Sequence, residues 1–319
     1  MKAKKTNPKK RNAPKASRTS RKTQLRAQAY SPSPKPLRQV DNNELSQFFV
    51  RYGYVAPNIK ITDEVLRRGL VRYQLFHGLP PTGEPDVKYL ALIRTPRCGI
   101  PEDSGDFAVF EKAKSERKTA RYLSMTNAAT HAGALPPVRP LKCRWPKSTQ
   151  TLNCFVDATS SNLNTADIVQ ACTDAFATWS KAIDQRIVFS EVTSEAAADI
   201  VLRWVLNDAD GFMAAQDVAH SDFPKRPRCQ VVRAYPLPVH FDLGRPWVVR
   251  VPPTAGFYDV QTIALHEVGH ILGMRHTGET DSIMRETLDP GTQQLALTDN
   301  DIDSVRAGYG LPLHFPHQP

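Results

Sequence analysis

Three histidines and a glutamate lie within the segment HEVGHILGMRH, which spans residues 266–276. On a helix, His266 and His270 lie one turn apart on the same face, so both imidazoles can bind one metal ion. Glu267 lies beside that ion, where its carboxylate can accept a proton from a metal-bound water. Gly273 allows a sharp turn out of the helix, because only glycine enters left-handed geometry without strain.

Such a turn can bring His276 back toward the helix and complete a site of three imidazoles with an open fourth position. This is the ligand arrangement of catalytic zinc, whereas structural zinc has four protein ligands. The HEVGH segment alone leaves open a core helix with histidines that happen to have this spacing. Gly273 and His276 disfavour that alternative, so we predict a hydrolytic zinc centre with Glu267 as its general base.

A second segment, TPRCGIPE at residues 95–102, places a cysteine where it could bind the same metal. A thiolate is a strong zinc ligand, and Zn²⁺ together with Arg97 would hold Cys98 deprotonated. Arg97 paired with Glu102 can hold the loop. Cys98 can therefore fill the fourth position, which an attacking water would need. The alternative is a loop cysteine without a ligand role.

The pattern HExxHxxGxxH, followed by Ser282–Met284, resembles the metzincin signature with its methionine turn. Thr277 and the PRCGxP segment, which is similar to a cysteine-switch motif, narrow the resemblance to the matrixins (matrix metalloproteinases). It implies a zinc endopeptidase made as a latent zymogen, with Met284 supporting the metal site without binding zinc. The sequence departs from the family at Glu102, where Asp is usual, and at Glu286, where Pro is usual.

Residues 41–102 have the pattern of a small helical unit. Apolar residues recur at helical spacing from Leu45 to Tyr52 and from about Asp63 to Phe76, and we expect a third short helix between residues 77 and 93. Together with the Cys98 segment, this order resembles the matrixin propeptide, which implies a three-helix domain that inhibits the enzyme.

Residues 144–312 have the pattern of an α+β domain. Strand-like segments at 149–156, 186–192 and 198–205 accompany an amphipathic helix at 164–183, and a last helix begins after Thr298. The order resembles the matrixin catalytic domain. That resemblance implies a zincin-like fold, with a twisted, mostly parallel sheet plus helices.

The resemblance extends to further metal sites whose ligand sets are incomplete. His220 and His240 match two ligands of a structural zinc in the family, but VLND at 205–208 replaces the HxD pair expected upstream. A second, structural zinc and two sheet histidines without metal are both open interpretations. Calcium is doubtful, because Pro238 and Arg245 stand where acidic ligands would be needed.

Two segments have the composition of exposed chain. Residues 1–40 contain thirteen Lys or Arg and no Asp or Glu, so we expect a disordered basic arm. Such an arm could contact nucleic-acid phosphates, direct the chain to a nucleus, organelle or particle, or act only as a solubilising tail. Residues 103–143 form a charged linker, where an activating protease would cut.

No apolar run is long enough to span a bilayer, and the first residues lack the apolar core of a secretory signal peptide, so the localisation stays undetermined. The five cysteines argue against a fully paired disulfide set. We expect a monomer that cleaves proteins or peptides after an activating protease removes the propeptide. A second hypothesis is a nucleic-acid- or assembly-associated protein that acts through residues 1–40, with a protease domain that is inactive or serves only self-processing.

Overall fold

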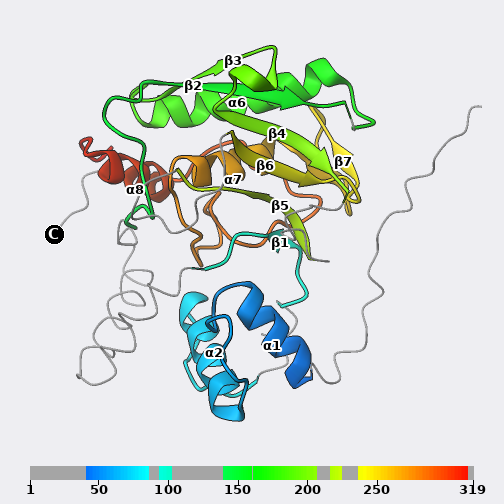
Figure 1. Cartoon of the computed structure of the whole chain (residues 1–319), viewed down its shortest axis with the longest axis vertical. Coiled ribbons are helices and arrows are strands. Elements are labelled where there is room, and N and C mark those ends of the chain that lie inside the picture. The colour runs from blue at the N-terminus through cyan, green and yellow to red at the C-terminus, as the bar shows by residue number, and fades with distance from the viewer. Residues whose placement is uncertain are drawn as a thin grey trace, which may run out of the picture.

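The computed structural model describes residues 41–85, 93–102, 139–159, 161–206, 216–224 and 236–314, and every structural statement below concerns these residues. A small helical unit at the start of the described chain lies against a larger α+β unit, with the Cys98 segment between them (Figure 1). The predictions for residues 1–40, for nearly all of the linker and for residues 86–92 of the expected third helix lie outside the described residues.

A single mixed sheet is the main layer of the α+β unit. Its strands are β1 (Arg97–Cys98), β2 (Thr151–Asp157), β3 (Val188–Glu191), β4 (Ile200–Val205), β5 (Asp217–Ser221) and β6 (Leu237–Asp242), in the spatial order β1-β5-β6-β4-β2-β3. All neighbouring strands are parallel except β5 and β6. A separate pair consists of β7 (Trp247–Val248) and β8 (Tyr258–Asp259). The predicted α+β class with a mostly parallel sheet is confirmed.

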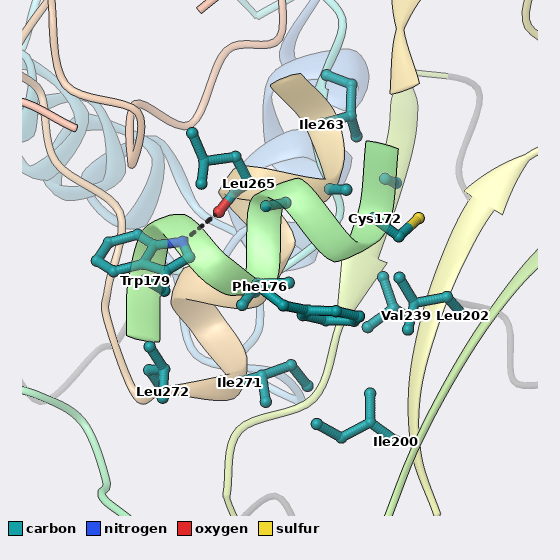
Figure 2. Close-up of a cluster of buried hydrophobic side chains, with 14 of the residues drawn as sticks. Cys172, Phe176, Trp179, Ile200, Leu202, Val239, Ile263, Leu265, Ile271 and Leu272 are labelled. Atoms are coloured by element: carbon teal, nitrogen blue, oxygen red, sulfur yellow. Dashed lines mark hydrogen bonds between the residues drawn. The ribbon is translucent and has the colours of Figure 1, made fainter. Parts of the chain in front are cut away.

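Two helices in contact form the centre of this unit. The helices of the unit are α6 (Thr165–Ala182), α7 (Val260–Ile271) and α8 (Asp299–Tyr309). Trp179 of α6 donates its indole N–H to the Leu265 carbonyl of α7 at 2.7 Å. Figure 2 shows Phe176 of α6 in the same buried cluster as Leu202 and Val239 of the sheet. The apolar stripe expected along residues 164–183 therefore packs into the core.

The first helical unit has a hydrophobic cluster of its own. It contains α1 (Asn42–Arg51) and α2 (Asp63–Phe76), close to the predicted spans. Asp41 and Thr62 cap the two helices by accepting hydrogen bonds from backbone N–H groups. Aromatic rings fill the space between the helices, notably Phe48, Tyr54 and Tyr73. The unit is thus held by aromatic packing against α2.

Helix α7 carries the HEVGH residues through the interior, and nearly all of its side chains are buried. A helix that is apolar on all sides belongs in a core. The helix leads into Gly273, whose φ is +97°. A Cβ atom at this position would lie 1.7 Å from the Cys143 carbonyl oxygen. Both the backbone conformation and the close approach of residue 143 therefore require glycine.

Helix α8 begins as the sequence predicts. Thr298 and Asp301 form a reciprocal capping box, and Gly310 ends the helix in a left-handed conformation with a φ of +70°. No helix in the described part of the chain is long and apolar enough to cross a membrane.

Replacement of Gly273 by alanine is expected to lower the free energy of unfolding by roughly 2–4 kcal/mol, because a positive φ and a steric collision act together. Gly256 provides a matched control, since its φ is +90° but nothing lies within 4 Å of a built Cβ. Gly256→Ala should therefore lose only about 1 kcal/mol. Chemical denaturation of both variants, followed by circular dichroism, compares the two losses; equal losses would refute the steric argument.

Candidate active site

The three histidines expected to bind metal surround one point in the α+β unit. His266 and His270 lie one turn apart on α7, and the turn at Gly273 brings His276 back beside them. The Nε2 atom of His270 is 3.2 Å from that of His266 and 3.1 Å from that of His276. All three rings are buried. The sequence spacing thus produces a compact group of imidazole nitrogens.

Hydrogen bonds to the other ring nitrogen set the tautomer of the two helical histidines. His266 Nδ1 lies 2.7 Å from the Ile283 carbonyl oxygen, and His270 Nδ1 lies 2.8 Å from the Met274 carbonyl oxygen. A carbonyl oxygen only accepts hydrogen bonds, so each Nδ1 must carry the proton. Each Nε2 therefore presents its lone pair to the shared point, as in metal-binding histidines.

The fourth donor at this point is the thiol of Cys98. Its sulfur lies 3.7 Å from His270 Nε2, and one ligand atom from each of the four side chains lies within 4.8 Å of the others. A tetrahedral zinc held by three nitrogens and one sulfur would place the nitrogens about 3.3 Å apart and the sulfur about 3.6 Å from each nitrogen. The observed separations are close to these values, and an ion between the lone pairs would remove their mutual repulsion. The residues present fit a zinc ion.

Burial determines the protonation states of these groups. It lowers the pKa of His266 to about 3 and the pKa values of His270 and His276 well below the ordinary value. The imidazoles are therefore neutral, which is the form that binds metal. Burial raises the pKa of the Cys98 thiol well above its usual range, and the charge of Glu267 raises it further. A coordinated divalent cation favours the thiolate instead.

Glu267 lies beside the Cys98 thiol. Its carboxyl group is buried and interacts with Cys98, and burial raises its pKa to about 8. Ser221 of strand β5 donates a hydrogen bond from Oγ to Glu267 Oε2 at 2.8 Å. The hydroxyl therefore orients the carboxyl group. Nothing in the sequence indicates this role for Ser221, because it depends on β5 lying beside α7.

Met284 packs directly behind α7. A Cβ at Gly269 would lie 2.3 Å from the Met284 sulfur, so glycine allows this close contact. The turn is held by Asp301 of α8, which accepts hydrogen bonds from Ser282 Oγ at 2.5 Å and from the Ile283 N–H at 3.1 Å. Asp301 therefore positions the Ile283 carbonyl, which orients His266. The sequence indicates Asp301 only as a helix-cap residue and does not reveal this second role.

Arg97 and Glu102 form a buried ion pair, with 2.5 Å between Arg97 Nη2 and Glu102 Oε1. The same oxygen lies 3.1 Å from His276 Nδ1. The Arg97 guanidinium carbon lies 3.9 Å from the centroid of the Tyr52 ring, at cation–π distance. The glutamate thus links the Cys98 loop to the third histidine as well as to Arg97.

Asp217 at the start of β5 joins the helical unit to the sheet. Tyr52 donates a hydrogen bond from Oη to Asp217 Oδ1 at 2.6 Å, and Arg51 forms an ion pair with Oδ2. Arg245 donates to the Asp217 carbonyl oxygen at 3.0 Å. These contacts link segments far apart in the sequence, so no local motif points to them.

The two histidines considered for a structural zinc lie opposite each other on neighbouring strands. His220 of β5 pairs in register with His240 of β6, and their ring centroids are 5.0 Å apart. Asp208 and Asp210, either of which could replace one of the missing upstream ligands, lie outside the described residues, so a structural zinc stays a prediction. Arg245, which stands where calcium would need an acidic ligand, donates from Nε to Asp242 Oδ2 at 3.0 Å.

A comparison with protein families matches residues 144–310 to the family described as Matrixin. Metalloendoproteinase 4-MMP of Arabidopsis thaliana is 29% identical over 294 residues, covering 90% of this chain and 77% of the relative. Metalloendoproteinase 1 of Glycine max is 27% identical, covering 84% of this chain and 82% of the relative. Macrophage metalloelastase of Rattus norvegicus is 27% identical, covering 85% of this chain and 50% of the relative.

The family match covers more than half of the chain and includes the three histidines and the glutamate of the site. Since the 294-residue alignment is longer than residues 144–310, similarity to the plant relative extends beyond the catalytic unit. The chain therefore belongs to the matrixin family and is a zinc metalloendopeptidase.

Proposed function

We propose that this chain is the latent form of the endopeptidase, and that Cys98 must leave the metal site before a substrate can bind. The supporting observation is the position of the Cys98 sulfur, 3.7 Å from His270 Nε2 and in contact with Glu267. That position is where the attacking water would be needed. Water and thiol cannot occupy it together, so latency follows from exclusion.

In the active form, His266, His270 and His276 would hold the zinc ion. Bound zinc lowers the pKa of a water molecule and polarises the scissile carbonyl. Glu267 accepts the proton of the attacking water and later delivers it to the leaving amine. Ser221 holds the Glu267 carboxyl group in place through the hydrogen bond to Oε2. Met284 supports α7 from behind and takes no part in proton transfer.

The path of the Cys98 segment supports an extended peptide as substrate. On one side, the Arg97 N–H donates to the Gln216 carbonyl, just before β5, at 3.0 Å. The Gly99 N–H donates to the Ala219 carbonyl, within β5, at 2.8 Å. On the other side, the Cys98 N–H donates to the Glu286 carbonyl at 2.9 Å. A substrate chain could make backbone hydrogen bonds with the same two walls. The cleft therefore suits proteins and peptides.

Activation requires the helical unit and the Cys98 loop to separate from the catalytic unit. We propose that residues 41–102 act as the propeptide, that residues 144–312 form the catalytic domain, and that cleavage within residues 103–143 separates them. The ion pair of Arg51 with Asp217 and the contact of Glu102 with His276 hold the proposed propeptide on the catalytic domain. Cleavage makes their dissociation irreversible, because the released propeptide is diluted.

Glu267→Ala is expected to lower kcat/KM of the activated enzyme by at least 10²–10⁴-fold, since that is the usual contribution of a general acid–base group. Its zinc content should stay equal to that of the wild type, because Glu267 is not a ligand. Metal analysis and cleavage of a fluorogenic peptide, with and without a chelator, measure both properties. Glu195→Ala, an exposed glutamate with side-chain exposure of 51%, is the control. Retained cleavage by the Glu267 variant would contradict the assigned role.

Cys98→Ser is expected to make the uncut chain active, because a neutral hydroxyl is a weaker zinc ligand than a thiolate. Peptide cleavage and intact mass should be measured on the same sample, so that activity is assigned to unprocessed chains. Cys172→Ala is the matched control, because Cys172 is a buried free thiol on α6 that is not part of the metal cluster. Unchanged latency of the Cys98 variant would exclude the thiol as the inhibitor.

A further inference from the structure

We propose that Glu286 makes the substrate cleft of the activated enzyme selective for a basic side chain, lysine or arginine, within two residues of the scissile bond. This inference rests on the proposed function, because the cleft is the space that the Cys98 segment occupies in the latent form. It concerns which peptides are cut, whereas the proposed function concerns whether peptides are cut.

The backbone places Glu286 next to the reacting position. Its carbonyl accepts the hydrogen bond from the N–H of Cys98, the residue whose sulfur lies at the metal site. The following residue, Thr287, pairs with Arg97 in antiparallel orientation. A substrate that replaces this segment would therefore pass Glu286 at the residues closest to the scissile bond.

The side chain of Glu286 is buried by the propeptide. The residue is only 1% exposed, and Glu286 Oε1 lies 3.4 Å from Nδ1 of His77 at the end of α2. The charge of Arg97 lowers the pKa of this carboxyl group, and the carboxylate in turn raises the pKa of the nearby Tyr73 hydroxyl. All three of these neighbours belong to the segment that activation removes. Removal therefore exposes the carboxyl group to the cleft.

The latent form does not fully satisfy this carboxyl group. Glu286 Oε2 has no hydrogen-bond partner among the described residues. Burial lowers the pKa of His77 to about 3, so the imidazole beside Oε1 is neutral and supplies no charge. Arg97 is already paired with Glu102 at 2.5 Å. Burying an acid with incomplete pairing costs free energy of folding. We therefore expect a function of Glu286 outside the latent form.

In the described residues of the catalytic unit, the charge of Arg285 acts on Glu286, but Arg285 forms its ion pair with another acid. In the described residues from 139 onward, no ion pair to Glu286 is present. The neighbouring Arg285 pairs instead with Asp289, with 3.3 Å between Nη1 and Oδ2. The exposed carboxylate can therefore form a charge-assisted hydrogen bond with a substrate cation. It would also repel an acidic side chain at the same subsite, which adds discrimination.

The propeptide shows which residue types this subsite accepts. It places the Arg97 cation where its charge acts on Glu286, beside the neutral imidazole of His77. A segment that blocks a cation-selecting cleft would be expected to present a cation there, because a cation matches the charge of the cleft wall. The location of a carboxylate beside the reacting position thus predicts a preference for basic side chains.

The test uses the full chain, activated by limited proteolysis and freed of the activating protease. Fluorogenic peptides carry lysine, its neutral isostere norleucine, or glutamate at each of the two positions on either side of the scissile bond. We expect kcat/KM for lysine to exceed that for norleucine by about tenfold at one of these positions, and glutamate to be the poorest. Glu286→Gln should remove the preference for lysine, and Glu286→Lys should favour glutamate.

Asp281→Asn is the matched control, because Asp281 is an exposed acid five residues earlier in the same segment and should leave the preference unchanged. Equal kcat/KM for lysine and norleucine at every position in the wild type would overturn the inference, and so would a preference that survives in folded, zinc-loaded Glu286→Gln. The wild-type comparison needs no variant, so misfolding of a variant leaves the test intact. Absence of any chelator-sensitive cleavage would instead contradict the proposed function.

Discussion

The convergence of three imidazole lone pairs on one buried point is the constraint on which the rest of this structure depends. The Nδ1 protons of His266 and His270 are donated to carbonyl oxygens, so the Nε2 atoms of both rings face the shared point. Such an arrangement is unfavourable without a cation and favourable with one. The burial of α7, the turn at Gly273 and the close packing of Met284 all serve to maintain it.

The proposed latency depends on the same point, because the Cys98 thiol approaches it from outside the catalytic unit. The propeptide presents one thiol to the metal site and secures it through contacts with the catalytic unit, among them the bonds to Asp217 and the hydrogen bonds along β5. Glu102 extends this hold to the third histidine. In the proposed latent form, the inhibitor is thus a folded unit that positions a ligand, and its removal would expose the position of the attacking water together with Glu286.

The chemistry of the site was predictable because local spacing determines it. Residues four apart on a helix must share a face, and glycine before the third histidine allows the return, so the cluster follows from the segment 266–276. The mostly parallel sheet and the caps at Thr62 and Thr298 were predictable for similar reasons. Ser221, Asp217 and Asp301 were not, because each acts on a residue distant in sequence and carries no local pattern.

X-ray absorption spectroscopy at the zinc edge tests the central claim most directly, because it reports the ligands of the ion in the intact, latent chain. The account predicts one zinc per chain with one sulfur at about 2.3 Å and three nitrogens at about 2.0–2.1 Å. After activation, the sulfur contribution should be replaced by a light oxygen or nitrogen scatterer. A latent chain without zinc, or with zinc that has no sulfur ligand, would contradict the account.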